Sequence, residues 1–277
     1  MTSPAIQRTQ VGPWRIWHQP DLDPHGLLEV LQPGDPEHWR LASECRLGER
    51  EVYAKASPLR GKAGLRYGLR QSLLGTPPPR LREFQNLVWL RRHLFLAPQP
   101  LACGLWRQAG RIRSQWLVTE RWTDWVAWDE VWAASSPSVR AARVIQAAEE
   151  VARMHALNFV HHDLFPRNAL VPRGEDLEGV AWLDAWAGGP GLGWRGPSYD
   201  LACWAVDWPT GWSTAEQVSF LETYRAGREA QGRPIQNFAR FLDRMQRERR
   251  ARALRERRRS DARAQVEIDW NPPALGR

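Results

Sequence analysis

The sequence has few cysteines and no long apolar run. Its three cysteines, Cys45, Cys103 and Cys203, are widely spaced and odd in number, which argues against a disulfide framework and against a zinc site. No stretch approaches the roughly 18 apolar residues of a membrane span. The opening stretch MTSPAIQRTQVGPW lacks the apolar core of a signal peptide. We therefore expect a cytoplasmic protein, and peripheral attachment to the inner membrane face stays open.

The composition is that of a globular protein, and it is unusually rich in tryptophan. The 277 residues are 43% hydrophobic and 25% charged, as in ordinary globular domains. They suffice for one large domain or for two lobes. We expect most of the 17 tryptophans in the core or lining grooves, because an indole removes much apolar area from water and its N–H needs only one partner.

The positive charge is concentrated near the C-terminus. The formal net charge is +8, and residues 241–263, FLDRMQRERRARALRERRRSDAR, hold ten arginines against four acidic residues. A basic helix of this kind suits an anionic membrane surface, although a helix kept soluble by its charge has the same pattern. Nucleic acid is an unlikely partner, because nothing in the sequence resembles a base-reading motif.

The first 122 residues read as an irregular lead-in and a small β-rich lobe. Residues 1–25 are rich in proline and polar groups and predict no regular element. Residues 26–122 form the predicted N-lobe, in which a basic connection at 58–79 leads into a helix. The patterns predict that helix at 80–94 and strands at 27–32, 38–45, 51–57, 99–106 and 114–122.

The remaining sequence predicts a larger, mainly helical lobe at residues 123–240, followed by a basic helix and tail at 241–277. Helices are predicted at 123–134 and 138–158, and a strand at 179–186. A β-rich N-lobe with one helix, followed by a helical C-lobe, is an α+β, two-lobed arrangement.

Polar residues that suit phosphoryl transfer stand in one order along these elements. They are Lys55 on a strand, Glu83 on the following helix, Asp163 and Asn168 in the stretch NFVHHDLFPRNALV, and Asp184 at the end of a strand. The reaction needs cations to neutralise the nucleotide phosphates and a group to position the attacking hydroxyl. A glutamate facing a lysine keeps the ammonium charged. A carboxylate and an amide suit Mg²⁺, and a second carboxylate can accept the hydroxyl proton.

The motif HHDLFPRN resembles the H-x-D-x-x-x-x-N catalytic loop of the protein-kinase-like superfamily. The segments EVYAKASPLRGK, RLREFQNLVWLRRHLFLAPQPLACGLW, WLVTERW, ARMHALNFVHHDLFPRNALV, WLDAW and SYDLACW are similar to the lipopolysaccharide kinase (Kdo/WaaP) family, whose members phosphorylate sugars of the lipopolysaccharide inner core. The similarity covers roughly residues 38–205. It implies a protein-kinase-like fold and an ATP- and Mg²⁺-dependent kinase whose acceptor is a heptose or Kdo hydroxyl.

The resemblance also implies a role for each matching position. Asp163 would be the catalytic base, Asn168 and Asp184 would bind Mg²⁺, and Lys55, paired with Glu83, would hold the nucleotide phosphates. The hinge that meets the adenine would be Thr119, Glu120 and Arg121, while His161 and Asp200 would support the catalytic loop.

Some positions depart from the protein-kinase pattern. No G-x-G-x-x-G is present, and QPGDPEH stands in its place. His162 replaces the arginine that pairs with a phosphorylated activation loop, and Phe165 replaces a lysine. Ala and Trp follow Asp184, and little room is left before Asp200 for a long activation segment. These departures favour a glycan or small-molecule acceptor over a regulated protein kinase.

Other functions stay open. The same site would suit a protein kinase or an aminoglycoside-type small-molecule kinase, and the fold would also suit a non-catalytic binding protein. His161, His162 and Asp163 could instead bind a metal with His155, but adjacent residues of an extended segment point to opposite faces. The tryptophans of RWTDWVAWDEVW have a spacing that is more typical of helix packing than of sugar stacking.

Overall fold

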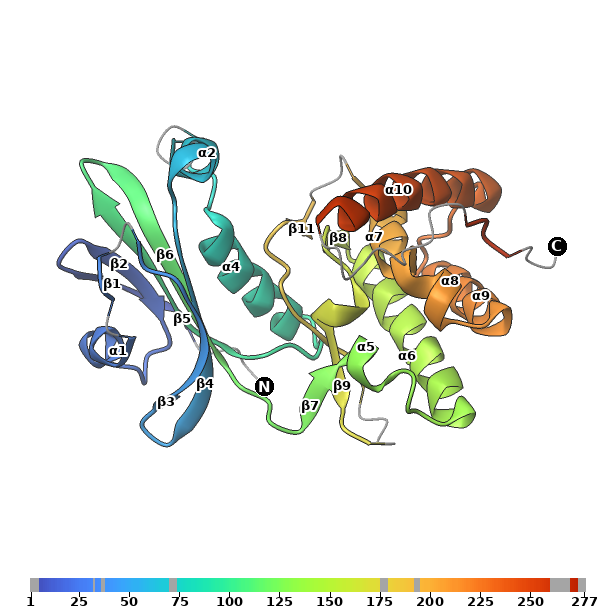
Figure 1. Cartoon of the computed structure of the whole chain (residues 1–277), viewed down its shortest axis with the longest axis horizontal. Helices are drawn as coiled ribbons and strands as arrows, with labels where there is room; N and C mark the ends of the chain where they lie inside the picture. The colour runs from blue at the N-terminus through green and yellow to red at the C-terminus, as the bar shows by residue number, and fades with distance from the viewer. Residues whose placement is uncertain are drawn as a thin grey trace. The chain divides into compact units, whose positions relative to one another are not determined.

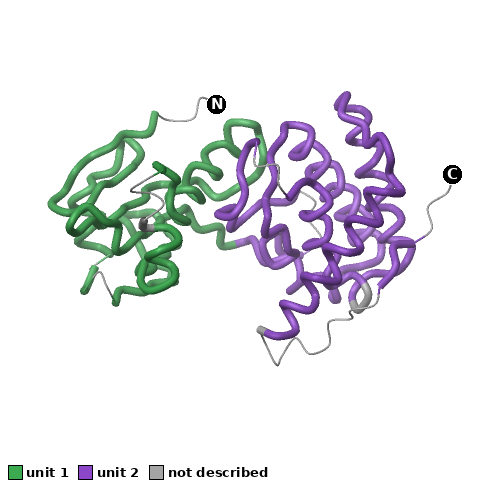
Figure 2. The backbone as a smooth tube through the Cα atoms, turned by 90° about the horizontal axis from the view of Figure 1, so that it is seen from above, with its two compact units in different colours: residues 1–123 green, residues 124–277 purple. Residues whose placement is uncertain are grey.

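The structure is a computed structural model that describes residues 5–31, 33–35, 38–69, 74–174, 179–191, 195–259 and 270–273. The chain divides into two compact units, residues 1–123 and residues 124–277 (Figure 2).

Unit 1 is built on one antiparallel six-stranded sheet with the strand order β1-β2-β5-β6-β4-β3. Helices α1(Pro24–Leu31) and α4(Pro79–Arg92) cover opposite faces of this sheet (Figure 1). The chain between β4 and α4 contains α2(Gly61–Ala63) and the π-helical turn η1(Gly64–Leu69). The strands are β1(Gln7–Val11), β2(Trp14–His18), β3(Leu41–Leu47), β4(Arg50–Pro58), β5(Pro100–Gln108) and β6(Arg111–Glu120).

The alternation of side chains along β4 assigns the two faces of the sheet. Val52 and Ala54 are buried in a core cluster that also contains Leu27 of α1. Because successive residues of a strand point to opposite faces, Tyr53 and Lys55 lie on the other face, which is the side of α4. The side chain of Lys55 therefore points away from the apolar core between the sheet and α1.

Two predictions for the N-terminal part of the chain were wrong. Residues 1–25, predicted to be irregular, contain the hairpin β1–β2, and β2 extends the sheet by pairing with β5. Residues 27–32, predicted as a strand, form α1 as far as Leu31, and Gln32 lies outside the described residues. The carboxylate of Asp23 accepts hydrogen bonds from the amides of His25 and Gly26, which favours helix initiation at this point.

Unit 2 consists mainly of helices around short strands. Strands β10(Ala181–Trp182), β9(Ala169–Pro172) and β7(Trp125–Ala127) form one small sheet, and β11(Gly189–Pro190) pairs with β8(Phe159–Val160). The helices and helical turns are α5(Trp128–Val131), α6(Pro137–Ala156), η2(Pro166–Asn168), α7(Pro197–Trp204), η3(Ala205–Asp207), α8(Trp208–Gly211), α9(Thr214–Ala230) and α10(Phe238–Arg259).

Residues 123–134 were predicted as a helix, and this prediction was wrong for their first half. Residues 125–127 form β7, which pairs with β9, and only 128–131 form a short helix. The backbone pairing between Val126 and Val171 outweighs the helical spacing of the apolar residues, because tertiary contacts routinely override local propensity.

Tryptophan side chains form the aromatic core of unit 2. The rings of Trp132 and Trp212 stack with their centroids 4.7 Å apart, and Trp128 lies 5.2 Å from both Trp132 and Trp204. Trp208 continues the cluster at 5.2 Å from Trp212. The tryptophans of RWTDWVAWDEVW that are buried, Trp128 and Trp132, therefore serve packing, as their spacing favoured.

The basic C-terminal segment forms α10, and one side of this helix is buried. Met245, Arg249, Arg252, Ala253 and Glu256 are each less than 10% exposed, at the spacing of one helical face. The helix packs against α7. Residues 260–263 of the basic segment lie outside the described part of the chain. Among the residues that the structure describes, no helix is long and apolar enough to cross a membrane.

Candidate active site

In unit 1, Glu83 of α4 holds two cations. Glu83 is 1% exposed. Its Oε1 accepts a hydrogen bond from Lys55 Nζ at 3.1 Å, and its Oε2 accepts one from Arg80 Nη1 at 2.6 Å. Lys55 is fixed at its Cα by β4, which pairs there with Ala42 of β3 and Leu117 of β6. A buried carboxylate with two cationic partners can keep the ammonium oriented.

Sequence reasoning missed Arg80. It stands three residues before Glu83, at a spacing where two side chains of a helix meet. It was overlooked because it follows three prolines, at the start of the predicted helix. Its amide donates to Gln115 Oε1 at 2.9 Å, so the first turn of α4 is tied to β6.

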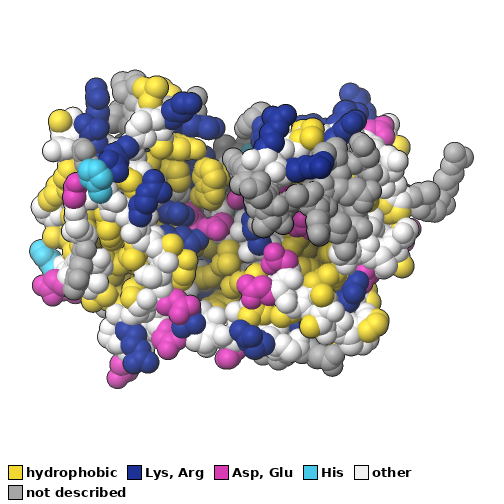
Figure 3. Space-filling model, in the orientation of Figure 1, with side chains coloured by type: hydrophobic (Ala, Val, Ile, Leu, Met, Phe, Trp, Pro, Cys, Tyr) yellow, Lys and Arg dark blue, Asp and Glu magenta, His cyan; other side chains and the backbone are white. Residues whose placement is uncertain are grey.

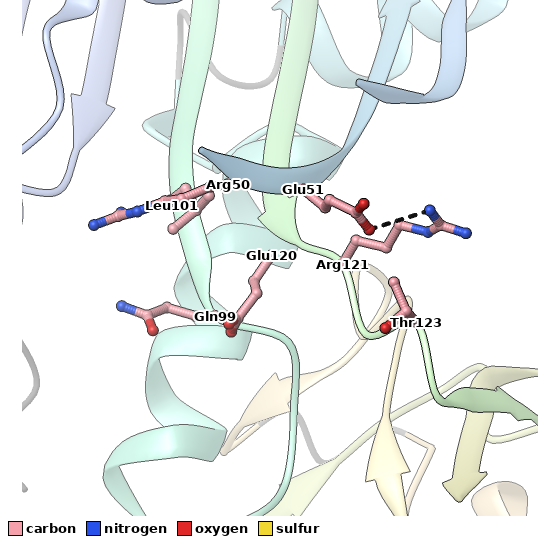
Figure 4. Close-up of a pocket in the computed structure, with 7 residues that line it drawn as sticks. All are labelled: Arg50, Glu51, Gln99, Leu101, Glu120, Arg121 and Thr123. Carbon is pink, nitrogen blue, oxygen red and sulfur yellow. Dashed lines mark hydrogen bonds and ion pairs between the residues drawn. The ribbon is translucent and has the colours of Figure 1, made fainter. Parts of the chain in front are cut away.

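Two of the three expected hinge residues, Glu120 at the end of β6 and Arg121 directly after it, line a pocket within unit 1. The pocket has a volume of about 400 Å³ and is lined by Arg50, Glu51, Gln99, Leu101, Glu120, Arg121 and Thr123 (Figure 4). Thr119 is buried and does not line it. The amides of Glu120 and Arg121 donate to the carbonyls of Gln99 and Glu51. The amides of Glu120 and Arg121 are therefore already used within unit 1 and are not offered to a nucleotide base.

Both arginines that line this pocket pair with carboxylates. Arg121 pairs with Glu44 at 2.9 Å and with Glu51 at 3.4 Å, and Arg50 pairs with Asp21 at 2.6 Å. Because each arginine is already neutralised, neither favours an anionic ligand in this pocket.

In unit 2, Asp200 of α7 organises the start of the catalytic-loop motif. Asp200 is fully buried. Its Oδ2 accepts from the amide of His161 at 2.6 Å, and its Oδ1 accepts from the amide of His162 at 2.7 Å. His155 Nε2 lies 3.1 Å from Oδ2, and His155 Nδ1 lies 2.8 Å from the hydroxyl of Tyr224. Three buried nitrogens thus converge on one carboxylate.

The ionisation of this pair follows from its burial. Burial lowers the pKa of His155, and this effect outweighs the opposing effect of Asp200. Burial alone would raise the pKa of Asp200, but the hydrogen bonds from His155 and the His161 amide bring it below its usual value. A neutral His155 fits both contacts, because Nε2–H donates to Asp200 while Nδ1 accepts from Tyr224.

Stability should therefore fall as the pH drops below about 6.5, the ordinary pKa of histidine. Because the pKa of His155 is lowered by folding, the unfolded chain binds the proton first, and the stabilisation present above pH 6.5 is lost as the pH falls toward the folded-state pKa. We expect this residue to lower the free energy of unfolding by up to about 1.4 kcal/mol for each pH unit in this range. Urea unfolding of the wild type and of His155→Gln between pH 7.5 and 5 measures this dependence. An equal slope in both proteins would contradict this assignment.

The structure brings Asp163 and Asn168 together. Asn168 Nδ2 donates to the carbonyl of Asp163 at 2.8 Å and lies 3.4 Å from Asp163 Oδ2. The amide nitrogen of Asn168 is thus used by Asp163, which leaves Oδ1 as the atom to offer a metal ion.

Leu183, the residue before Asp184, makes two hydrogen-bond contacts with the same loop. The amide of Leu183 donates to the carbonyl of Asn168 at 2.8 Å, and His161 Nε2 lies 2.8 Å from the carbonyl of Leu183. Asp184 itself has a φ of 54°, an uncommon conformation for a residue with a side chain. Such strain concentrates at functional sites.

The donor set suits Mg²⁺. An amide oxygen from Asn168 and a carboxylate from Asp184 are hard oxygen ligands of the kind this ion prefers. The part of the chain that the structure describes has no cluster of three His, Cys, Asp or Glu residues that could hold a metal ion. Each of the three histidines makes hydrogen bonds within the protein, which speaks against the alternative of a histidine metal site.

His162 holds the segment between Asp184 and Asp200. Its Nδ1 lies 3.1 Å from the carbonyl of Ala187, and its Nε2 lies 2.5 Å from the carbonyl of Arg195.

At Gly188, a Cβ atom would lie 1.9 Å from the carbonyl oxygen of Val160, so only glycine allows this backbone approach.

An arginine of α10, Arg252, contacts the expected catalytic base, and sequence reasoning missed it. Its Nη2 donates to Asp163 Oδ1 at 3.0 Å. The side chains of Arg252 and Asp163 are 10% and 19% exposed. The sequence carries no signal for this contact, because the two residues are 89 positions apart and Arg252 stands among many arginines.

Part of the sequence matches a known protein family. Residues 66–184 match the sequence model of the lipopolysaccharide kinase (Kdo/WaaP) family. The resemblance to this family is confirmed. The predicted enzyme class, a kinase, is confirmed with it. No curated protein matches the chain.

Solved structures support the fold. A structure of WaaP in complex with acyl carrier protein has a TM-score of 0.59 and 19% identity, and the match covers 83% of this chain and 92% of the other. Glucosamine kinase in complex with glucosamine, ADP and inorganic phosphate has a TM-score of 0.52 and 14% identity, covering 96% and 93%. Another crystal form of glucosamine kinase has a TM-score of 0.54 and 13% identity, covering 95% and 92%. The predicted α+β, kinase-like fold is confirmed.

Proposed function

We propose that this kinase transfers the γ-phosphoryl group of ATP, with Mg²⁺, to a sugar hydroxyl of the lipopolysaccharide inner core, a heptose or Kdo. The observation that carries the proposal is the catalytic loop of unit 2. There hydrogen bonds hold the carboxylate of Asp163 beside Asn168, whose side-chain oxygen can bind a metal ion. The family to which residues 66–184 match supports the choice of acceptor.

Each unit contributes its own part of the chemistry. In unit 1, Lys55 is oriented by Glu83 and supplies a cation for the phosphates. In unit 2, Asn168 and Asp184 offer oxygen ligands to Mg²⁺, which, when bound, neutralises the charge of the phosphates. Asp163 accepts the proton of the attacking hydroxyl, and the hinge at Thr119–Arg121 receives the adenine.

The acceptor is a sugar rather than a protein in this proposal. The stretch from Asp184 to Asp200 is short, and His162 ties it at two carbonyls, which leaves little chain for a peptide-binding platform. A second candidate is a free amino sugar or an aminoglycoside-type acceptor, which is favoured by the fold likeness to a glucosamine kinase in complex with glucosamine and ADP.

The proposal is tested with γ-labelled ATP and a panel of acceptors, namely purified inner-core lipopolysaccharide, glucosamine, an aminoglycoside and a generic protein substrate. We expect label on the core glycolipid, and the transfer rate should fall about 100-fold or more in Lys55→Met because a phosphate-binding cation is lost. Lys62→Met, on α2, is the matched control. Label on protein alone would reject the glycan proposal. If the protein shows no Mg²⁺-dependent nucleotide binding, the alternative of a non-catalytic binding protein is favoured.

We further propose that the outer face of α10 rests on an anionic membrane surface, where the glycolipid acceptor lies. Arginines 247, 255, 257 and 258 are exposed, and Figure 3 shows Lys and Arg side chains gathered over α10. Each such arginine contributes roughly 1 kcal/mol near an anionic surface.

Replacing Arg247, Arg255 and Arg258 together with glutamine should therefore weaken binding to phosphatidylglycerol-containing vesicles by roughly 100-fold at low salt. Neutral phosphatidylcholine vesicles provide the control. If the wild type sediments equally with both kinds of vesicle, or with neither, α10 is only a solvated helix.

A further inference from the structure

Arg252 lies in a site that fixes its guanidinium from several directions. Besides Asp163, it contacts Glu256 Oε1 at 3.4 Å and the hydroxyl of Tyr199 at 3.4 Å. Its guanidinium carbon also lies 4.6 Å from the centre of the Phe165 ring, within range of a cation–π interaction. Burial would lower the pKa of Arg252, but the surrounding Cys203, Tyr199, Asp163 and Glu256 raise it overall. The group stays a cation.

The stability of unit 2 does not explain why this cation is buried. Desolvating an ion pair costs about as much as the pair regains, and apolar replacements are often neutral or stabilising. The arginines at the exposed positions of α10 would keep the helix soluble without this contact. The contact does, however, reach the carboxylate to which the proton-accepting role is assigned.

The residues that follow Asp163 directly in the catalytic loop are uncharged. They are Leu164, Phe165 and Pro166. The nearest arginine of the loop, Arg167, lies over Phe165 at 3.8 Å and 3.7 Å from Glu256 Oε2. Arg252, which donates to Asp163, comes instead from α10, a helix that begins 75 residues after the loop's aspartate.

The contacts distinguish the two oxygens of Asp163. Oδ1 accepts the 3.0 Å hydrogen bond from Arg252, whereas Oδ2 has, among the residues that the structure describes, only a long contact of 3.4 Å to Asn168. Because the shorter bond fixes the plane of the carboxylate, Oδ2 is the oxygen that can receive a proton from a hydroxyl. Arginine suits this task, since its planar guanidinium can reach Asp163 through Nη2 while Nη1 is held by the hydroxyl of Tyr199.

We propose that Arg252 is a positioning residue of the phosphoryl transfer and that α10 thereby completes the active site. This inference rests on the proposed function. As the acceptor oxygen forms its bond to the γ-phosphorus and the bond to the β-phosphate oxygen breaks, the hydroxyl proton passes to Asp163 Oδ2 and ADP leaves. Arg252 keeps its protons throughout and holds Oδ1.

Steady-state kinetics with Mg·ATP and purified inner-core lipopolysaccharide test this role. Arg252→Met keeps an unbranched stem against Phe165 and removes the charge. We expect kcat to fall about 100-fold, the typical cost of misplacing a catalytic group, while KM for ATP changes less than about threefold. Arg252→Lys should recover part of kcat because it restores a cation. Arg225→Met, an exposed position of α9 outside both the loop and the basic face of α10, should match the wild type.

Asp163→Asn separates this inference from the proposed function. If Arg252 acts through Asp163, then Arg252→Met should lower kcat little further in the Asp163→Asn background. Wild-type kcat in Arg252→Met, together with a strong loss in Asp163→Asn, overturns the role of Arg252 and leaves the proposed function standing. Equal transfer by the wild type and Asp163→Asn overturns the proposed function itself. If Arg252→Met does not fold, the Arg252→Lys variant decides the question. A kcat at least about fivefold below that of the wild type supports positioning by the guanidinium. An unchanged kcat rejects it.

Discussion

Replacing Asp163 with asparagine should lower kcat about 1000-fold, within the range that a general base contributes. The substitution is nearly isosteric. An asparagine oxygen can still accept the hydrogen bond that Arg252 donates to Oδ1, so the loop should keep its shape. The group that is lost is the carboxylate oxygen that accepts the proton of the acceptor hydroxyl. Binding of Mg·ATP, measured by calorimetry, should change little, since the phosphate-binding residues are untouched.

Asp243→Asn provides the matched control for this experiment. Asp243 is an exposed aspartate on α10, so its replacement removes the same charge from unit 2 away from the loop. A decrease in kcat of similar size in both variants would show that net charge, and not the position of Asp163, governs the rate.

Replacing Asp200 with alanine should lower the free energy of unfolding by about 3–5 kcal/mol, because three buried hydrogen-bond donors lose their acceptor. The substitution leaves the amides of His161 and His162 and the ring of His155 without their acceptor. Each unsatisfied buried donor costs about 1–3 kcal/mol. Because two of these donors belong to the loop that carries Asp163, activity should be lost even at temperatures at which the variant is folded. Urea unfolding followed by tryptophan fluorescence measures the stability.

Two further variants separate charge from packing at Asp200. Asp200→Asn retains one acceptor oxygen and should fall between the wild type and the alanine variant. Glu222→Ala, at an exposed position of α9, should change stability by less than about 0.5 kcal/mol. If Asp200→Ala unfolds at the wild-type urea concentration, the network does not support the loop.

Some contacts between the candidate site residues were more predictable from the sequence than the positions of some elements were. Lys55 and Glu83 form the expected pair because each follows a strong local pattern, an apolar strand and a helix stripe. Residues 27–32 were misassigned because LLEVLQ is too short for periodicity to separate a strand from a helix. The hairpin β1–β2 depends on pairing with β5, which lies more than 80 residues away in the chain.

Arg252 shows the other limit of sequence reasoning. The composition of α10 indicates only a basic helix, and the pattern of charge suits membrane, solvent and active site equally. Which arginines turn inward is decided by packing against α7, a contact between distant segments. Arg249, which donates to the carbonyls of Ala205 and Val206, shares that inner face with Arg252.

Mass spectrometry of inner-core lipopolysaccharide, after incubation with ATP and Mg²⁺, tests the central claim most directly. We predict that the wild-type protein adds one phosphoryl group to a core sugar and that Asp163→Asn adds none in the same time. A core glycolipid whose mass is unchanged by folded, ATP-binding wild-type protein would contradict the account.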